Sequence, residues 1–421
     1  MSRRLSLVMV LSGIFFLLDL YLFQGVVAAT QGLAPTTRQL VHQLWWGLYG
    51  LVVAGLLAYN LLDPYRLGPK TRMAILAGVF ALFMGKLFML FFMVIEEARR
   101  LIGWLWASLS GEAPPAWLDP ARSAIVSRIG AAAAAVPVLA TGWGILSGAH
   151  DYRVRRETIY LPELPEAFDG LRLLQLSDIH AGSFWSPQAV QRGIELVVRQ
   201  EADLICFTGD LVNNRADEMA TYQDLFAQIR APMGVYSILG NHDYGDYVAW
   251  PSPEAKRDNL RRLAEVHRAM GWDLLLNQHR WLQRDGARIA LLGIENWGAK
   301  ANFPQYGKLS EAYAGTEEAP VHILLSHDPS HWQAEVRPDY PKIDLTLSGH
   351  THGMQFGVEI PGLAKWSPVQ YVYPEWGGLY REGGQYLYVN RGFGYLGFPG
   401  RIGIPPEITV LTLKRGQAPD R

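Results

Sequence analysis

Five short apolar runs in the second half of the chain, each ending in polar residues, restrict the fold more than any other feature of the sequence. The first three runs are LRLLQL (171–176), DLICFT (203–208) and GVYSIL (234–239). Helices are expected at about 187–200, 217–230 and 253–270. Further strands are expected at about 287–293, 321–325, 343–347 and 407–413. Strand–helix–strand order predicts parallel strands covered by helices, so we expect an α/β fold here.

The polar residues at the ends of these runs form one chemically consistent set. They are Asp178, His180, Asp210, Asn241, His327, His350 and His352. Because sites in open α/β sheets gather beyond the carboxyl ends of the strands, we expect these side chains to meet at one edge. Oxygen and imidazole ligands without sulfur suit Mn, Fe or Zn, and the set is too rich in histidine for a dedicated Ca or Mg site. Seven ligands are too many for one small ion, but they suit two divalent ions that share a carboxylate.

The order of these motifs resembles the signature of a known enzyme family. They read SDIH, TGD, GNHD, SHD and SGHTH along the chain. This series is similar to that of the calcineurin-like metallophosphoesterases over about 170–415, and the closing segment 389–413 resembles the ending of the membrane-associated branch. The resemblance implies an αββα sandwich and a metal-dependent phosphoesterase.

The resemblance also implies a role for each residue of the set. One ion would be held by Asp178, His180, Asp210 and His352, and the other by Asp210, Asn241, His327 and His350. Asp210 would bridge the two ions, and a water between them would lose a proton and attack phosphorus in line. His242 matches the family's histidine that is not a ligand and acts as general acid for the leaving oxygen. The sequence does not identify substrate-binding residues.

One position departs from the family pattern. Many members have Asp three residues after the aspartate of the GD motif, paired with the acid histidine, whereas this chain has Asn213. An amide oxygen can still orient the ring of His242, but it does not stabilise an imidazolium by charge. Asp243 is a candidate substitute and equally a candidate turn residue.

Four other polar residues near the motifs have a structural and a functional interpretation. We expect Asp328 to cap a strand end and His331 to be a surface or hydrogen-bonded histidine, with a place beside the metals as the alternative. Arg391 and Arg401 lie in a glycine-rich loop, where we expect loop anchors. The alternative is that one of these arginines binds a substrate phosphate.

The aromatic residues beside the motifs leave their roles open. Trp185 and Tyr244 either line the substrate cleft or pack in the core. The segment 371–380 (YVYPEWGGLY) is either a lid or a lip that faces the membrane. The sequence does not decide between these alternatives.

Four apolar stretches in the first 150 residues are long enough to cross a bilayer, which takes roughly 20 residues per helix. They lie at about 5–29, 41–62, 73–95 and 129–149. The stretch 101–110 is too short to span alone and either lies at the interface or extends a neighbouring helix. The sequence therefore predicts an all-α transmembrane region, 1–150, followed by a metallophosphoesterase domain, 151–421.

The distribution of Lys and Arg predicts the orientation of these spans. With the N-terminus inside, the inside segments hold Arg3, Arg4, Arg66, Lys70, Arg72, Arg153, Arg155 and Arg156. The outside segments hold Arg38, Arg99, Arg100 and Arg122. The balance favours a multi-pass membrane protein with a cytoplasmic catalytic domain.

Two charged residues, Asp19 and Lys86, fall near the middle of predicted spans. A charge at that depth costs at least a few kcal/mol unless it is paired. We therefore expect the two side chains to face each other. The alternative is a protonated Asp19 and a Lys86 side chain that reaches toward the interface.

Composition removes some classes of function and leaves three. The net charge of −1 gives no basic field for nucleic acid, and the single cysteine, Cys206, excludes an intramolecular disulfide. The leading hypothesis is a membrane-anchored two-metal phosphoester hydrolase, with a phospholipid or another phosphodiester as substrate. The alternatives are a phosphoprotein phosphatase and a metal-binding regulatory module without turnover. The sequence does not indicate an oligomeric state.

Overall fold

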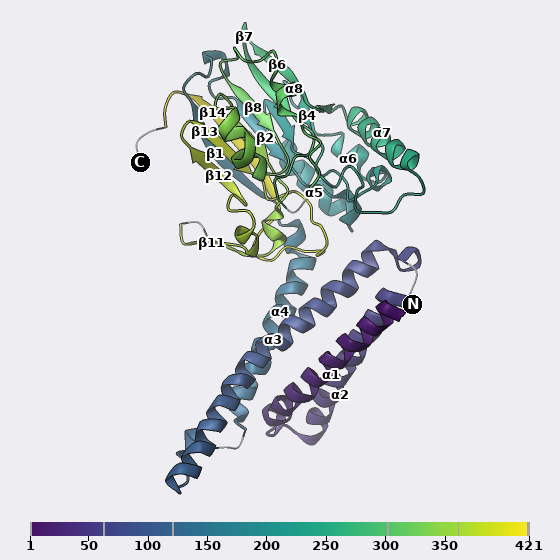
Figure 1. Ribbon diagram of the computed structural model, residues 1–421, viewed down its shortest axis with the longest axis vertical. Helices are drawn as coiled ribbons and strands as arrows, with labels where there is room; N and C mark the ends of the chain where they lie inside the picture. Colours follow the sequence, from purple (N-terminus) through teal and green to yellow (C-terminus); the bar gives the residue numbers. More distant parts are fainter. Residues whose placement is uncertain (1, 62–63, 120–121, 301–302, 361, 419–421) are drawn as a thin grey trace. The chain divides into compact units, whose positions relative to one another are not determined.

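Long apolar helices make up the first part of the chain, and two mixed sheets make up the second. The computed structural model describes residues 2–61, 64–119, 122–300, 303–360 and 362–418. The chain divides into two compact units, Met1–Trp143 and Gly144–Arg421 (Figure 1). This division lies a few residues before the boundary that we expected at 150.

Each sheet of the second unit has six strands. One runs in the order β1 (Arg153–Leu161), β14 (Glu407–Arg415), β2 (Arg172–Leu176), β3 (Leu204–Phe207), β4 (Val235–Ser237) and β5 (Asp273–Leu274). The other runs β12 (Gly378–Glu382), β13 (Gln385–Val389), β9 (Leu345–Ser348), β8 (His322–Leu325), β7 (Ala287–Gly293) and β6 (Gln278–Arg284). Strands β2 to β5 are parallel, as are β7, β8, β9 and β13. The parallel pairing predicted from strand–helix–strand order is therefore confirmed.

Alternation along the strands divides the apolar core into layers, because successive side chains point to opposite faces of a sheet. Leu173 of β2 and Ile323 of β8 belong to one buried cluster, which draws on both sheets. Leu174 belongs to a second cluster with residues of α5 (Pro187–Val198) and α7 (Pro253–Ala269). Leu324 belongs to a third, with α8 (Leu309–Tyr313) and the π-helix η6 (Trp332–Val336). The layers follow the order helices, sheet, sheet, helices, as the resemblance implies.

One expected helix is wrong. Instead of a helix over 217–230, the structure has a short 3₁₀ turn η5 (Ala216–Met219) and a single-turn α6 (Gln223–Phe226). The Glu218 carboxylate accepts hydrogen bonds from the main-chain N–H groups of Asn213, Asn214 and Arg215, at 2.6, 3.1 and 3.1 Å. These bonds hold the start of this segment against the loop after β3. The apolar residues that suggested one helix therefore lie in two short helical turns.

The remaining elements of the second unit are short. A hairpin joins β10 (Val358–Ile360) to β11 (Ala364–Trp366). The helical turns are η2 (Gly148–His150), η3 (Glu166–Phe168), η4 (Ala181–Ser183), α9 (Arg337–Asp339), η7 (His352–Gln355) and η8 (Pro368–Tyr371). Several of these turns flank the strand ends that carry the polar motifs.

The first unit consists of long helices. They are α1 (Ser2–Thr30), α2 (Pro35–Leu61), α3 (Pro64–Ser110) and most of α4 (Ala124–Leu146), with a 3₁₀ turn η1 (Ala116–Leu118) before α4. Four segments are long and apolar enough to cross a membrane: Ser12–Thr30, Pro35–Leu61, Lys70–Ser110 and Ala124–His150. The four predicted spans are therefore helices of sufficient length. The stretch 101–110 extends α3, which decides between our two alternatives.

The two charges expected inside the spans form an ion pair. The Nζ atom of Lys86 lies 2.7 Å from Oδ2 of Asp19, and both side chains are buried. The prediction that they face each other is confirmed. Pairing removes most of the penalty of two isolated charges in an apolar layer.

Candidate metal centre

The seven residues predicted as ligands all lie at or just beyond strand ends of the second unit. Asp178 and His180 follow β2, Asp210 follows β3 and Asn241 follows β4. His327 follows β8, and His350 and His352 follow β9. The two parallel strand sets thus deliver the whole group to one region.

The backbone is strained where these side chains leave the strands. Ten described residues other than glycine have positive φ, and five of them are Asp178, His180, Asp210, His350 and His352. Their φ angles run from 49° to 72°. The left-handed conformation costs roughly 1–2 kcal/mol per residue. Strain concentrated at one site is typical of functional positions, where surrounding packing holds it.

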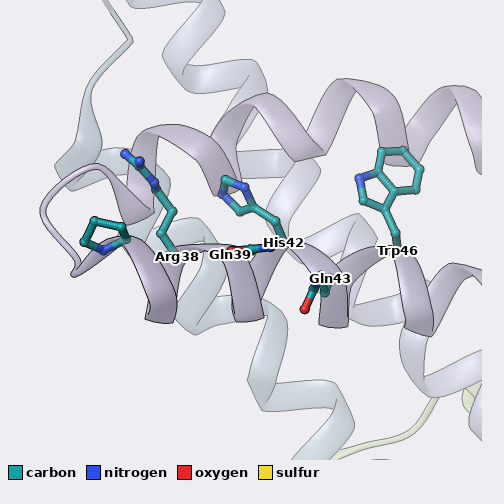
Figure 2. A pocket seen from close by; sticks show the side chains of 6 residues that line it. Arg38, Gln39, His42, Gln43 and Trp46 are labelled. Atoms are coloured by element: carbon teal, nitrogen blue, oxygen red, sulfur yellow. The ribbon is translucent and has the colours of Figure 1, made fainter.

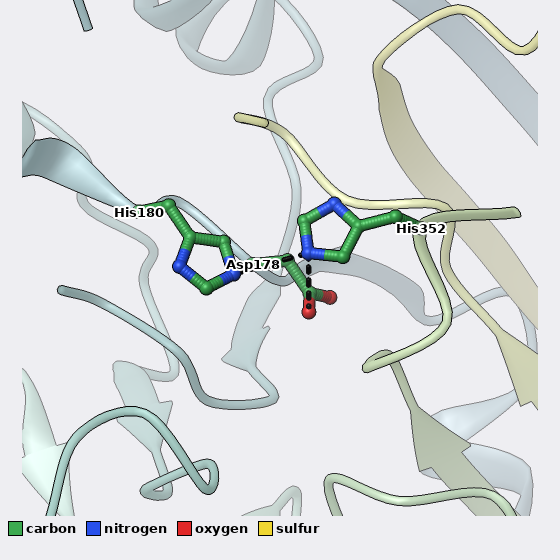
Figure 3. Close-up of side chains that lie close together, drawn as sticks. All are labelled: Asp178, His180 and His352. Carbon is green, nitrogen blue, oxygen red and sulfur yellow. Dashed lines mark hydrogen bonds and ion pairs between the residues drawn. The ribbon is translucent and has the colours of Figure 1, made fainter. Parts of the chain in front are cut away.

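Asp178, His180 and His352 form the first cluster, with their nearest ligand atoms within 4.8 Å of one another. The Nε2 atoms of His180 and His352 lie 3.0 Å apart, and Nε2 of His352 lies 3.4 Å from Oδ1 of Asp178. Figure 3 shows the two rings and the carboxylate converging on one point. Burial lowers the pKa of His180 to about 3 and the pKa of His352 well below its ordinary value, so both rings are neutral. Neutral imidazoles facing a carboxylate suit a cation.

Asp210, His327 and His350 form the second cluster, also within 4.8 Å. The Oδ1 atom of Asn241 joins it, 2.9 Å from Nδ1 of His350. His327 donates from Nδ1 to the carbonyl of Thr208 at 2.7 Å, which fixes its tautomer. Its Nε2 atom is buried without a hydrogen-bond partner. Instead it lies 3.1 Å from Oδ2 of Asp210, and a ring nitrogen held toward a carboxylate in this way fits a metal ligand.

One oxygen of Asp210 lies between the two clusters. Its Oδ2 atom is 3.5 Å from Nε2 of His180 in the first cluster and 3.1 Å from Nε2 of His327 in the second. Its Oδ1 atom accepts a hydrogen bond from the main-chain N–H of His242 at 2.9 Å. Burial raises the pKa of Asp210, but the neighbouring histidines outweigh burial and hold that pKa well below its ordinary value. The Asp210 carboxylate is therefore ionised, and it lies where a ligand shared by two ions would have to lie.

His242 is oriented by the main chain and not by the Asn213 side chain. Its Nδ1 donates to the carbonyl oxygen of Asn213 at 2.8 Å. The Asn213 amide instead donates to Oγ of Ser183 at 3.1 Å. The ring packs 4.6 Å from the ring of Tyr247 and 5.0 Å from that of His180, measured between centroids. We expected the Asn213 side-chain amide to contact the ring. The main-chain carbonyl of the same residue makes the contact instead, and any residue at this position would supply that carbonyl.

Asp243 fixes two loops. Its carboxylate accepts hydrogen bonds from the main-chain N–H groups of Asp210, Leu211, Val212 and Gly240, at 2.9 to 3.1 Å. These bonds use both carboxylate oxygens and tie the loop after β3 to the loop after β4. Of its two interpretations, the structure supports the turn residue.

Two tyrosines reach the site and were missed by the sequence analysis. The hydroxyl of Tyr373 lies 3.0 Å from Nε2 of His350 and donates to Oδ2 of Asp328 at 3.2 Å. The hydroxyl of Tyr247 accepts a hydrogen bond from Nδ2 of Asn241 at 2.8 Å. The only signal for Tyr373 is its place in the aromatic segment 371–380, and a tyrosine far from a motif in sequence gives no sign of such a contact.

The other polar candidates have structural roles. Asp328 accepts from the main-chain N–H of Ser330 at 2.8 Å, as expected of a cap. His331 is buried between Ser326 and Glu335, at 2.9 and 3.1 Å. Tyr244 is buried with its hydroxyl on Glu295 at 3.1 Å, whereas Trp185 is 40% exposed.

Both arginines of the glycine-rich loop are anchors, as expected. Arg391 pairs with Glu407 and Glu359, each at 2.6 Å. Arg401 is buried and donates to main-chain carbonyls of Arg391 and Gly394 at 2.8 and 2.6 Å. Neither guanidinium is free to take a substrate phosphate in this arrangement.

A groove on α2 of the first unit has a different chemistry. Its volume is about 610 Å³, and it is lined by Pro35, Arg38, Gln39, His42, Gln43 and Trp46. Figure 2 shows these side chains along one stretch of helix. Its lining has one histidine and no carboxylate, so it does not repeat the metal-ligand pattern of the second unit.

Comparisons with known proteins agree with this geometry. A family profile described as "Calcineurin-like phosphoesterase" matches residues 171–354. One described as "Probable Calcineurin-like phosphoesterase, transmembrane domain" matches residues 3–149. Together they account for most of both units.

Three curated relatives are similar to this chain. An uncharacterised metallophosphoesterase of Bacillus subtilis (strain 168), YkuE, is 31% identical over 70% of this chain and 97% of its own length. A transmembrane protein with metallophosphoesterase domain from Bos taurus is 26% identical over 98% of this chain and 89% of its own. The UDP-2,3-diacylglucosamine pyrophosphatase LpxG of Chlamydia trachomatis serovar D is 28% identical over 66% of this chain and 94% of its own.

The fold, the two buried ligand clusters and these similarities lead to one conclusion. The second unit has the layers and the strand-end residues of a metal-dependent hydrolase, and the first has helices that can cross a membrane. The chain belongs to the membrane-bound calcineurin-like metallophosphoesterases, and it is a hydrolase of phosphoric esters.

Proposed function

We propose that this protein is a membrane-anchored two-metal phosphoester hydrolase whose substrate is a phospholipid-type or another phosphodiester. The observation that carries the proposal is the position of Oδ2 of Asp210, 3.5 Å from a ring nitrogen of one cluster and 3.1 Å from a ring nitrogen of the other. A single oxygen within reach of two clusters is the arrangement that a shared ligand requires. Two-metal sites of this type clamp the attacking and leaving oxygens of a displacement at phosphorus.

The proposed ligand sets follow the two clusters. One ion is held by Asp178, His180, Asp210 and His352, and the second by Asp210, Asn241, His327 and His350. Mixed carboxylate, amide and imidazole ligands favour Mn, Fe or Zn. When bound, such ions supply positive charge for the phosphoryl group and make a water between them more acidic.

His242 is the proposed general acid, because its geometry leaves one ring nitrogen for the substrate. Its Nδ1 is used by the Asn213 carbonyl, so Nε2 is the atom that can hold a proton for the leaving oxygen. The N–H of the same residue binds Asp210, which fixes the distance between acid and bridge. Asp210 thus links the orientation of the acid to the position of the ions.

A lipid-like substrate is proposed on two grounds. The chain carries four helices able to cross a membrane, so the catalytic unit works beside a bilayer. The chlamydial relative is named as a pyrophosphatase of UDP-2,3-diacylglucosamine, a sugar nucleotide that carries two acyl groups. Both favour an amphiphilic phosphoester over a phosphoprotein. We also propose that the catalytic unit lies on the cytoplasmic side, from the distribution of Lys and Arg.

The test uses the purified full chain in detergent, with bis-p-nitrophenyl phosphate and added Mn. We expect turnover that is lost in Asp210→Asn and His242→Ala. His279→Asn is the matched control, because His279 lies on β6 and its Nδ1 donates to the carbonyl of Ala312, away from the clusters. Bound metal with no turnover of any phosphoester would instead support a regulatory module.

A substrate panel separates the remaining classes. Phospholipids, acylated sugar nucleotides, free nucleotides and a phosphoprotein are compared at equal concentration by kcat/KM. We expect the acylated substrates to exceed the others. Preference for the phosphoprotein would overturn the lipid part of the proposal and leave the two-metal hydrolase intact.

A further inference from the structure

Exposed apolar side chains of the second unit are concentrated in one segment. Of the fifteen large apolar side chains that are exposed among its described residues, eight lie within 354–372. They are Met354, Phe356, Val358, Ile360, Leu363, Trp366, Tyr371 and Val372. Leu363 is 80% exposed and Tyr371 is 78% exposed. Soluble surfaces rarely gather so much apolar area in one place without a partner.

The hairpin β10–β11 at the centre of this segment has one apolar and one charged face. Val358 pairs with Trp366, Ile360 with Ala364, and Glu359 with Lys365. Because side chains alternate along a strand and paired residues share a face, the first two pairs lie on one face and the third lies on the other. Phe356 extends the apolar face, with its ring 6.3 Å from that of Trp366.

The charged face is fixed to the rest of the unit. Glu359 pairs with Arg155 at 2.5 Å and with Arg391 at 2.6 Å, and only 10% of its side chain is exposed. Lys365 donates to the hydroxyl of Tyr380 at 3.0 Å. With its polar face held this way, the hairpin presents its apolar face outward as a fixed feature.

The base of the hairpin is hydrogen-bonded to a loop that holds the end of a candidate span. The segment Ala124–His150 is apolar enough to cross a membrane, and its residues from Gly144 onward belong to the second unit. The carbonyl of Gly144 accepts a hydrogen bond from the N–H of Arg401 at 3.1 Å. The next residue, Ile402, exchanges main-chain hydrogen bonds with Gln355 and Gly357, at 2.8 and 3.0 Å.

Glycines make this close approach possible. A Cβ on Gly144 would lie 2.8 Å from Cγ1 of Ile402, and one on Gly400 would lie 2.8 Å from the carbonyl carbon of Gly144. The helix end and the loop therefore meet backbone to backbone. The base of the apolar face therefore lies beside the last turns of the candidate span, which ends at His150.

We propose that the apolar face of the β10–β11 hairpin, with Leu363 and Trp366, inserts into the interfacial layer of the membrane that the helices cross. Lipid is the favoured occupant because the base of the hairpin is hydrogen-bonded to a loop that contacts the last turns of a helix apolar enough to cross a membrane. Trp and Tyr are enriched at that depth, where an apolar ring meets polar headgroups. An apolar face of this kind binds by burying its surface among headgroups and acyl chains.

Insertion would also set the approach to the metal centre. The segment leaves the centre at His352 and returns to it at Tyr373, whose hydroxyl contacts His350. A hairpin seated in lipid would therefore hold the part of the centre around Tyr373 and His350 near the headgroup layer. The inference concerns binding and does not depend on turnover, so it stands or falls separately from the proposed function.

The experiment measures the depth of the hairpin in the full chain, reconstituted in phosphatidylcholine and phosphatidylglycerol vesicles. Leu363→Cys and Tyr371→Cys are each labelled with an environment-sensitive fluorophore, and quenching by spin-labelled lipid is recorded. The native Cys206 is buried and so gives little background. Asp285→Cys is the control, because Asp285 is an exposed turn residue between β6 and β7 of the same unit.

Blue-shifted emission with lipid quenching at 363 and 371, and neither effect at 285, is the expected result. A Trp366→Asp substitution should reduce the quenching at 363. Equal spectra at 363, 371 and 285 would overturn the proposal. So would a blue shift without lipid quenching that increases with the protein-to-lipid ratio, since that result would place a second copy of the chain on the hairpin.

Discussion

At the scale of single residues, the acid histidine depends on a main-chain contact. Nδ1 of His242 is bound by the carbonyl of Asn213, and a carbonyl is present whatever side chain stands at that position. The departure from the family's aspartate therefore removes a charge near the ring and leaves its orientation intact. The identity of residue 213 should matter less than the sequence alone indicates.

Asn213→Ala should keep kcat within about threefold of the wild type, because the ring retains its hydrogen bond. His242→Ala should lower kcat by roughly 10²–10⁴, the usual contribution of a positioned acid. Both are measured by hydrolysis of bis-p-nitrophenyl phosphate, with bound metal quantified in parallel. A loss in Asn213→Ala as large as that in His242→Ala, at unchanged metal content, would show that the amide itself acts in catalysis.

The site residues were predictable because each follows an apolar run directly. Asp178, Asp210 and His327 are adjacent to strands whose ends must meet, so sequence order was enough to group them. Tyr373 was not predictable, because it reaches His350 only after an intervening hairpin. A contact that forms only because a loop folds back to the site leaves no pattern in the neighbouring sequence.

At the scale of elements, α7 is held to the first sheet by a buried histidine. His267 shares a hydrogen bond with Oγ of Ser237 on β4 at 3.0 Å and lies among Phe207 and Trp272. Burial lowers the pKa of His267 to about 3. The folded protein thus keeps this ring neutral at a pH where the unfolded chain protonates it.

The free energy of unfolding should therefore fall as pH falls below about 6.5, the ordinary pKa of histidine. Below that pH the His267 ring binds a proton in the unfolded state but stays neutral in the folded state. This difference lowers the free energy of unfolding by up to about 1.4 kcal/mol per pH unit until the pH nears 3. Thermal melting of wild type and His267→Gln in detergent, from pH 7.5 to 5.0, checks this. The variant should start less stable and lose less on acidification; equal slopes would contradict the prediction.

The helices α1 and α3 are joined by the buried ion pair of Asp19 and Lys86. Removing one partner leaves an unpaired charge in an apolar layer, which costs about 3 kcal/mol. Asp19→Asn and Lys86→Met should each reduce the yield of monodisperse protein in detergent, measured by size-exclusion chromatography. The double charge swap, Asp19→Lys with Lys86→Asp, should recover most of that yield. A swap no better than the single variants would show that the pair is incidental.

Helices and strands were predictable where the apolar residues follow a single clear pattern along the chain. The spans and the buried strands follow from long or short apolar runs, whereas the segment 217–230 has helical spacing and forms two short turns. There the hydrogen bonds from three main-chain N–H groups to the Glu218 carboxylate outweigh the local preference for one continuous helix. The hairpin β10–β11 was missed because three-residue strands are too short to show alternation.

At the scale of the whole molecule, the chain joins a unit of candidate membrane spans to a unit with the candidate metal centre. The candidate span Ala124–His150 is followed by β1, a strand of the sheet in which β2, β3 and β4 each precede candidate ligands, so the second unit is tethered at its first residues. The apolar hairpin gives that unit a second proposed attachment. If both attachments hold, the proposed substrate in the membrane would be close to the site at no further cost of encounter.

The proposed side of the membrane rests on the charges that flank the spans. Inside segments carry eight Lys and Arg residues and outside segments four, when the N-terminus is inside. If all four candidate spans cross, the N-terminus and the catalytic unit lie on the same side. A fluorescent protein that matures only in the cytoplasm, fused after Arg421, should therefore fluoresce. Alkaline phosphatase, active only outside, should be active when inserted after Gly111 and inactive after Arg421. The reverse pattern would invert the topology, and equal reports at both positions would contradict a crossing by Ala124–His150, the candidate span that lies between them.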